Sequence, residues 1–190
     1  MTVYRHICFA VIAIGSVFMT IGHASDHVIN RFGSPQAMQD FDAFRNQRFN
    51  AFFDQGSWHG FLLPEKNEQR GGFTGPLIVA EEYAVFLASA LDTVHVIDVQ
   101  HQQVFENHLA QWSSAERDGA LWQKLQWPSI ELTLELRFVS AHTAIIKTQL
   151  RNISESPQTL QLEWHGKLLQ QWQTSASANA ERQTLLATVA

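Results

Sequence analysis

The chain has 190 residues and a formal net charge of −5. No basic face is visible that could bind phosphates, so nucleic-acid binding is disfavoured. The single cysteine, Cys8, lies in an apolar N-terminal run, so the remainder of the chain has no thiol for a disulfide, a metal-thiolate site or a nucleophile. A packed apolar core must therefore stabilise the fold, and aromatic residues make up 11% of the chain.

The N-terminus has the three parts of a secretory signal peptide. Arg5 precedes an apolar run at residues 7–21, and Gly22-His23-Ala24 follows as a small-residue cleavage site. Because this run is shorter than the roughly 20 residues that span a bilayer, cleavage is favoured over an uncleaved anchor. We expect residues 1–24 to be removed and residues 25–190 to form one exported domain with no membrane attachment.

Four segments at short spacing predict an antiparallel meander or sandwich. Apolar and polar side chains alternate throughout residues 130–138, the pattern of a half-buried strand. Residues 159–164 alternate in the same way. Residues 122–127 before the first strand are rich in apolar residues and end at a turn signal, and residues 143–150 after it are rich in strand-forming residues. The predicted fold class is all-β, with two more strands upstream, at residues 77–79 and 93–97.

The other segments are less regular. Residues 81–91 fit either a helix or a buried strand, and Ser34-Pro35 is a plausible helix start. Residues 174–182 predict a loop, and the apolar, strand-like residues 185–189 follow it. A chain that ends on such a segment predicts a sandwich that is incomplete at its C-terminal end.

Residues 47–64 contain the densest group of unusual side chains. Aromatic residues, an acid and a histidine lie close together there, and Gly56 and Gly60 permit tight backbone geometry. Such a loop can present an aromatic platform with polar groups beside it, as sugar sites require. The alternative is that the segment wraps around a sheet edge and buries its aromatic rings. The candidate substrate-binding residues are Phe53, Asp54, Trp58 and His59.

Glycoside hydrolysis requires a pair of carboxyl groups. Glu131 and Glu135 lie on the predicted wet face of a strand, where acids are solvated, and Glu81 and Glu82 would point to opposite sides of a strand. With Asp54 as the remaining candidate, no catalytic pair is predicted within this chain.

No metal site or cofactor is predicted either. His95, His101 and His108 recur at spacings of six and seven residues, with no acidic partner at ligand spacing, whereas zinc sites need three or four convergent donors. No Gly-x-Ser-x-Gly motif is present, so a serine hydrolase elbow is not indicated. Asn152-Ile-Ser154 is a glycosylation sequon, which matters only in a eukaryotic secretory pathway.

A series of motifs runs along the whole mature chain. They are Val28-Ile-Asn-Arg31-Phe-Gly33-Ser-Pro35-Gln36, Gln47-Arg-Phe-Asn50, Phe52-Phe-Asp54, Gly56, Trp58-His-Gly60, Leu62-Leu-Pro64, Gly71-Gly-Phe73, Glu81-Glu-Tyr83, Leu134-Glu-Leu-Arg-Phe138 and Trp164-His-Gly-Lys-Leu168. In order and spacing they resemble the N-terminal region of bacterial glycoside hydrolase family 63 enzymes of the periplasmic α-glucosidase type.

The resemblance implies an N-terminal β-sandwich. In the family an (α/α)6 barrel follows it and supplies the acid and base for inverting hydrolysis of α-glucosidic bonds, and no position here matches the barrel's catalytic carboxylates or its calcium site. We therefore expect a truncated, periplasmic, non-catalytic domain without a cofactor, whose partner is a catalytic barrel in cis or on a separate chain.

The resemblance also implies that residues 52–59 lie near the sandwich–barrel interface and shape the entrance to the sugar site, with an oligosaccharide as a further ligand. The alternative is a free-standing β-sandwich that binds carbohydrate or docks on a partner.

Overall fold

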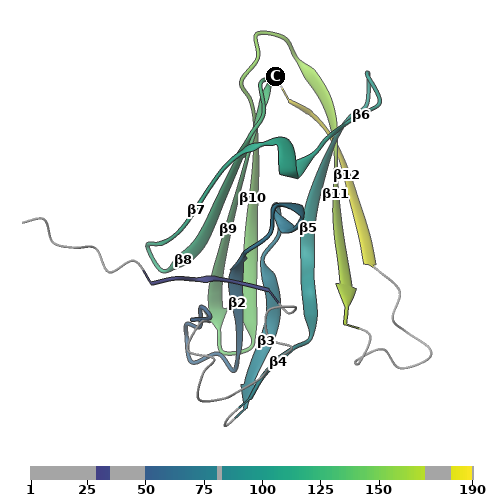
Figure 1. Cartoon of the computed structure of the whole chain (residues 1–190). Helices are drawn as coiled ribbons and strands as arrows, with labels where there is room; N and C mark the ends of the chain where they lie inside the picture. Colours follow the sequence, from purple (N-terminus) through teal and green to yellow (C-terminus); the bar gives the residue numbers. More distant parts are fainter. Residues whose placement is uncertain (1–28, 35–49, 81–82, 170–180, 190) are drawn as a thin grey trace, which may run out of the picture.

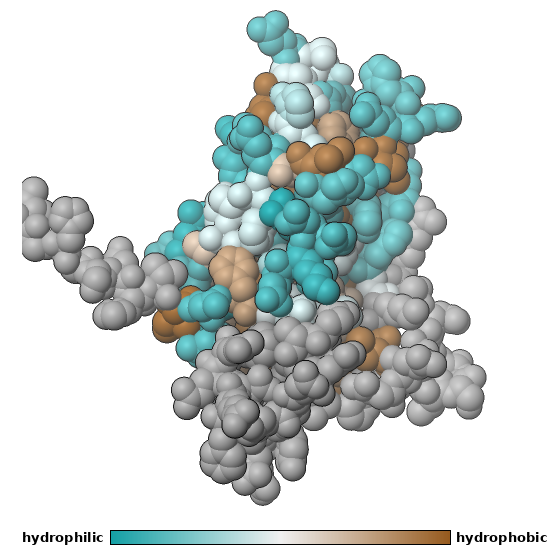
Figure 2. Space-filling model, in the orientation of Figure 1, coloured by the Kyte–Doolittle hydropathy of each residue, from teal (hydrophilic) through white to brown (hydrophobic). Residues whose placement is uncertain are grey.

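The structure, a computed structural model, describes residues 29–34, 50–80, 83–169 and 181–189, and these form three four-stranded β-sheets (Figure 1). The predicted signal peptide and most of the segments predicted as a helix start and as a late loop lie outside the described residues. On the side drawn in Figure 2, hydrophilic residues cover much of the described surface. Within the described part of the chain, no helix is long and apolar enough to cross a bilayer.

The all-β fold predicted from the sequence is confirmed. The strands are β1 (Phe32–Gly33), β2 (His59–Pro64), β3 (Thr74–Ala80), β4 (Tyr83–Phe86), β5 (Ala88–Asp98), β6 (Gln103–Phe105), β7 (Gln111–Arg117), β8 (Ala120–Gln126), β9 (Ile130–Ser140), β10 (Thr143–Asn152), β11 (Gln158–Leu168) and β12 (Glu181–Val189). Two short 3-10 helices, η2 (Asn67–Gln69) and η3 (Asn107–Leu109), lie between strands. The ambiguous residues 81–91 contain β4 and the beginning of β5.

One sheet is an antiparallel meander in the order β10-β9-β8-β7. The inner side chains of β9 are buried at every second position, as the alternation predicted. On the outer face Glu131 forms ion pairs with Lys124 on β8 (2.5 Å) and Arg151 on β10 (3.0 Å). The hydrogen bond from Lys124 and the charges of both cations hold the pKa of Glu131 below its usual range. Glu135 forms an ion pair with Arg137 on the same face of the sheet. Both acids predicted on the solvent-exposed face therefore form ion pairs.

The second sheet has the order β12-β11-β5-β6. Four consecutive antiparallel strands can form a single meander, but β11 does not pair with β10. It pairs with β5 instead, with Leu162 opposite Val96. The change of sheet takes place in the turn after β10, where Asn152 Nδ2 donates to the carbonyl of Ser156 (2.8 Å). Because the chain passes from one sheet to the other, the fold is a sandwich and not a single meander. The strand-like residues 185–189 form part of β12, which pairs with β11.

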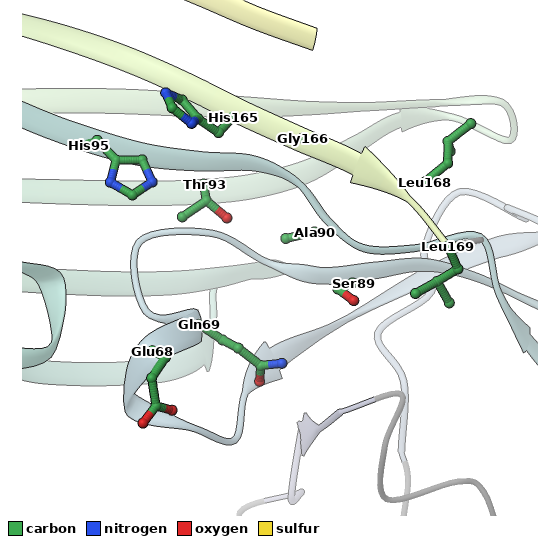
Figure 3. Close-up of a pocket in the computed structure, with 10 residues that line it drawn as sticks. All are labelled: Glu68, Gln69, Ser89, Ala90, Thr93, His95, His165, Gly166, Leu168 and Leu169. Carbon is green, nitrogen blue, oxygen red and sulfur yellow. The ribbon is translucent and has the colours of Figure 1, made fainter. Parts of the chain in front are cut away.

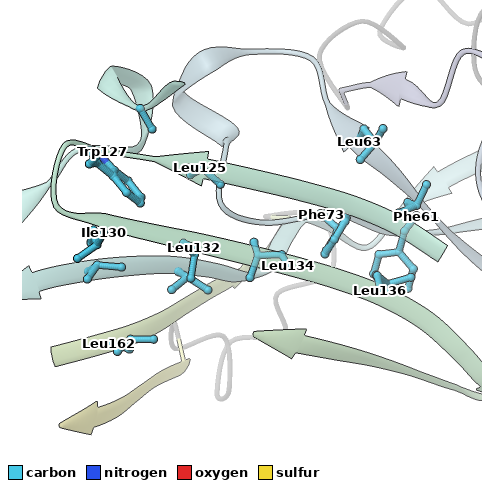
Figure 4. Close-up of a cluster of buried hydrophobic side chains, with 14 of the residues drawn as sticks. Phe61, Leu63, Phe73, Leu125, Trp127, Ile130, Leu132, Leu134, Leu136 and Leu162 are labelled. Atoms are coloured by element: carbon cyan, nitrogen blue, oxygen red, sulfur yellow. The ribbon is translucent and has the colours of Figure 1, made fainter. Parts of the chain in front are cut away.

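The core lies between these two sheets (Figure 4). Leucines of β9 and β11 face each other there, and Leu132, Leu134 and Leu162 are all almost completely buried. Phe61 and Phe73 enter the same cluster from the third sheet and the segment before β3. Since burying one such side chain stabilises the fold by about 1.5–3 kcal/mol, this cluster is the main source of stability in a domain without disulfides.

The third sheet has the order β1-β2-β3-β4, and its β1–β2 pair is parallel, unlike the antiparallel pairing predicted throughout. Arg31 fixes this arrangement. Its guanidinium pairs with Glu116 on β7 (2.5 Å) and donates to the carbonyls of Asn50 and Ala51 (2.9 Å each). The chain just before residue 52 is thereby held against the meander sheet.

Residues 70–73, which we call the clamped segment, are held by buried polar side chains from other elements. Asn107 Nδ2, on η3, donates to the carbonyls of Arg70 (2.8 Å) and Val94 (2.9 Å). Gln123 on β8 is fully buried, and its Nε2 donates to the carbonyl of Gly72 (2.7 Å) while its Oε1 accepts from Trp112 Nε1 (3.2 Å). The clamped segment therefore ties the third sheet to the meander.

The clamped segment is also tied to β5. The Val94 amide donates to the carbonyl of Gly71 (2.8 Å), and the Phe73 amide donates to Asp92 Oδ1 (3.3 Å). Gly71 has a φ of +89°, and a Cβ there would lie 2.3 Å from Asn107 Nδ2, so only glycine fits. Asp92 as a whole is half-buried, but its Oδ2 atom is not accessible to solvent and has no hydrogen-bond partner among the described residues. Burial of the carboxyl group raises the pKa of Asp92 to about 7.

Replacing Gln123 by leucine should destabilise the fold by about 1–3 kcal/mol, because it leaves the buried Gly72 carbonyl without a donor. Urea unfolding followed by tryptophan fluorescence measures the change, with the exposed Gln149→Leu on β10 as the matched control. A Gln123→Leu midpoint equal to that of Gln149→Leu would show that the clamp contributes nothing.

Asp92→Asn should flatten the pH dependence of stability. The folded-state pKa of about 7 lies above the ordinary value of 3.8, so between these values the folded state keeps a proton that the unfolded state has released. The contribution of Asp92 is thus complete below pH 3.8 and is lost as the pH rises through about 7. The urea midpoint should therefore fall from acid to alkaline pH, and this fall should be smaller in Asp92→Asn than in the wild type. The control is Asp118→Asn, at an exposed turn, which should behave like the wild type. Equal falls in all three proteins would contradict this assignment.

Candidate functional site

The candidate site is a hairpin loop closed by Phe52 and Phe61, whose backbones exchange two hydrogen bonds of 2.8 and 3.1 Å. The turn at its tip has Gln55 and Gly56 at φ values of 53° and 68°, and the Ser57 amide donates to the carbonyl of Asp54 (3.0 Å). Two consecutive positive φ angles are the geometry of tight hairpin turns. The loop is therefore held by its own backbone bonds.

Two of the four predicted residues, Phe53 and Trp58, have exposed rings. Trp58 is 49% exposed and Phe53 is 37% exposed, and the Phe53 ring packs so closely on Gly60 that a Cβ there would lie 2.6 Å from it. Asp54 has a different role, since its Oδ1 accepts the amide proton of Gln55 (2.7 Å) and so helps to form the turn.

His59 lies beneath Trp58, and only 9% of it is exposed. Its ring centroid is 5.2 Å from those of both Trp58 and Phe138 and 5.9 Å from that of Phe61. Burial, and secondly the charge of His142, lower the pKa of His59, so the ring is neutral at neutral pH. Its Nδ1 is buried and has no partner among the described residues.

The aromatic residues of this loop are divided between a buried and an exposed group. Phe52 and Phe61 are buried and pack on Phe138 of β9, as a segment wrapping a sheet edge would. Phe53 and Trp58 point into solvent, as a platform would. The sequence could not divide the aromatic residues between these roles, because the division depends on the turn at residues 54–57. The exposed rings offer stacking and apolar contact rather than acid–base chemistry.

The three regularly spaced histidines do not come together. His101 pairs with Asp98 (2.7 Å), His108 lies 3.8 Å from Glu106, and the ring of His95 lies 4.6 Å from that of His165. The Asp98 partner, three residues before His101, was missed in the sequence. Among the residues that the structure describes, no three histidine, cysteine, aspartate or glutamate side chains are grouped so that they could hold a metal ion. Glu81 and Glu82 lie outside those residues.

A pocket of about 580 Å³ was not foreseen from the sequence (Figure 3). Thr93 and His95 of β5 lie beside His165 of β11 on one side, and Glu68 and Gln69 of η2 lie on the other. These residues come from three segments far apart in the chain, so no local spacing could have revealed the site.

A second group of exposed apolar side chains consists of Val99, Val104 and Leu109, which are 40%, 41% and 72% exposed. Figure 2 shows apolar residues in the upper part of the molecule, at the level of β6 and η3 in Figure 1. These aliphatic side chains lie on the β5–β6 hairpin and on η3. They have neither the aromatic rings nor the backbone-fixed turn of the 52–61 loop, so the 52–61 loop is the stronger candidate site.

Comparison with known families adds an independent finding. The family described as the N-terminal part of glucosidase YgjK matches residues 30–189. The match begins before β1 and ends with β12, and it includes the 52–61 loop and the clamped segment. It covers well over half of the chain and agrees with the resemblance to glycoside hydrolase family 63. The chain belongs to the family of N-terminal domains of YgjK-type glucosidases in glycoside hydrolase family 63.

Proposed function

We propose that this chain serves a periplasmic α-glucosidase as its non-catalytic N-terminal domain and that the exposed rings of Phe53 and Trp58 dock on the catalytic domain. The enzyme would hydrolyse α-glucosidic bonds in oligosaccharides. The observation that carries the proposal is the pair of exposed aromatic rings on a backbone-fixed loop of a glucosidase N-terminal domain.

The chemistry of the loop suits protein docking. Tryptophan and phenylalanine are enriched at the centres of protein interfaces, where one buried ring can supply a large part of the binding free energy. The Trp58 ring rests on His59, which is itself packed against Phe138, so its position is supported from below. A ring that is already held in place loses little conformational entropy on docking.

The loop is poorly equipped for hydrolysis. Asp54 uses one carboxylate oxygen in the turn, and hydrolysis would need a second carboxyl group across the sugar. The outward glutamates Glu131 and Glu135 are paired with basic side chains on the meander sheet. A role in positioning the catalytic domain and shaping the entrance to its sugar site is therefore favoured over catalysis by this domain.

The second candidate function is a free-standing carbohydrate-binding sandwich. The exposed face of Trp58 favours it, since an indole ring can also stack on a sugar. Titration of the folded chain with gluco-oligosaccharides, followed by tryptophan fluorescence, distinguishes the two. A fluorescence change that Trp58→Ala abolishes would support sugar binding at the loop.

Trp58→Ala should weaken association of this domain with the catalytic barrel of the same enzyme by about tenfold, because truncating a buried interface aromatic costs about 1–2 kcal/mol or more. Calorimetric titration of the two purified domains measures the affinity. The matched control is Trp122→Ala, since Trp122 lies on the outer face of β8 under the guanidinium of Arg117. Equal affinities for wild type and Trp58→Ala would exclude docking through this ring.

The 190-residue chain alone should release no glucose from α-linked gluco-oligosaccharides, because its loop lacks a carboxyl pair. A coupled glucose assay at high protein concentration tests this expectation. Glucose release that is lost in Asp54→Asn, with the fold intact by circular dichroism, would show that the chain is itself a glucosidase.

A further inference from the structure

We propose that the pocket between β5, β11 and η2 binds a neutral, polyhydroxylated ligand of the size of a hexose or disaccharide. Its volume of about 580 Å³ lies within the range of small-molecule sites. None of its lining residues belongs to the 52–61 loop, so it is a different site from the proposed docking surface.

One wall of the pocket is a group of polar side chains fixed across two strands. Glu163 on β11 lies opposite His95 on β5, and His165 lies opposite Thr93. His165 Nε2 is 2.9 Å from Glu163 Oε2, and the other carboxylate oxygen accepts from Gln161 Nε2 (2.6 Å). The His165 imidazole is thus held in place by a buried carboxylate, and the His95 ring lies beside it with a centroid distance of 4.6 Å, so both can exchange hydrogen bonds with a ligand.

The shape of the pocket depends on an irregularity in β11. The register between β11 and β5 shifts on both sides of Lys167, directly after Gly166. A Cβ on Gly166 would lie 2.4 Å from the carbonyl oxygen of Leu91, so the two backbones approach each other here as only glycine allows. Bulges of this kind redirect side chains and are common beside binding sites.

The charges that the structure describes around the pocket argue against an anionic ligand. Glu68 lines it and the buried Glu163 lies behind His165, whereas no lysine or arginine is among the lining residues that the structure describes. Burial lowers the pKa of His95, and the neighbouring His165 adds to this effect, so His95 is not a positive charge that could attract an anion. Phosphates and carboxylates are therefore disfavoured.

The pocket is lined by both hydrogen-bonding and apolar groups. Ser89 and Thr93 offer hydroxyl groups, and Gln69 offers a side-chain amide. Ala90 and Leu169 supply apolar surface. A sugar likewise combines hydroxyl groups with apolar C–H faces, so this mixed lining matches its chemistry.

The test is a titration of the whole chain with D-glucose and with maltose, followed through the imidazole nitrogen and carbon resonances of His95 and His165 in NMR spectra. We expect saturable shifts with a dissociation constant on the order of 1 mM, since small ligands gain little free energy per atom. Inorganic phosphate and an alkylammonium salt serve as anionic and cationic probes and should give no saturable shift. Saturation by either of these probes, or by neither sugar, would overturn the proposal.

Variants locate the site. Ala90→Phe fills the pocket and should weaken sugar binding at least about tenfold, whereas Ser113→Phe, at an exposed position of β7, should leave it within about twofold. His95→Gln keeps a polar side chain and should weaken sugar binding severalfold. This variant still tests the site if Ala90→Phe does not fold. Trp58→Ala should leave sugar binding unchanged. Binding that survives Ala90→Phe and His95→Gln but is lost in Trp58→Ala would assign the sugar to the 52–61 loop and refute this inference.

Discussion

The hydrogen bonds made to the clamped segment join all three sheets of the described structure. Residues 70–73 lead into β3 of the third sheet, while Gln123 belongs to the meander and Val94 to β5 of the second sheet. Arg70 adds a contact of its own, since its guanidinium lies over the Trp112 ring at 4.5 Å. Apolar packing between sheets is non-directional, so these few directional bonds fix how the sheets lie relative to one another.

Much of the fold could be predicted from the sequence because alternation is a local property. Residues 130–138 alternate strictly, and they form the central part of β9. By contrast β2 is buried along its whole length, so it shows no alternation, and its residues were interpreted as part of a loop. The pairing of β11 with β5 rather than β10 also could not be predicted, because the two strands are some sixty residues apart.

The candidate site was only partly predictable for a related reason. The glycines and aromatic residues of the 52–61 loop indicated an unusual surface, but the exposure of Phe53 and Trp58 follows from the positive φ angles at Gln55 and Gly56. The pocket beside His95 and His165 needs β5, β11 and η2 in register, which no local pattern encodes. Both surfaces lie on a domain whose family is defined by a glucosidase, although their chemistry differs: one is aromatic and apolar, the other polar and acidic.

Along β10, side chains alternate between exposed and half-buried, and within the described residues this strand ends its sheet. A ten-residue strand with a free backbone edge could recruit the same edge of another molecule and begin aggregation. Lys147 and Arg151 on this strand oppose such pairing, because an antiparallel copy would bring like charges together. The cation that neutralises Glu131 within one molecule thus also helps to keep neighbouring molecules apart in solution.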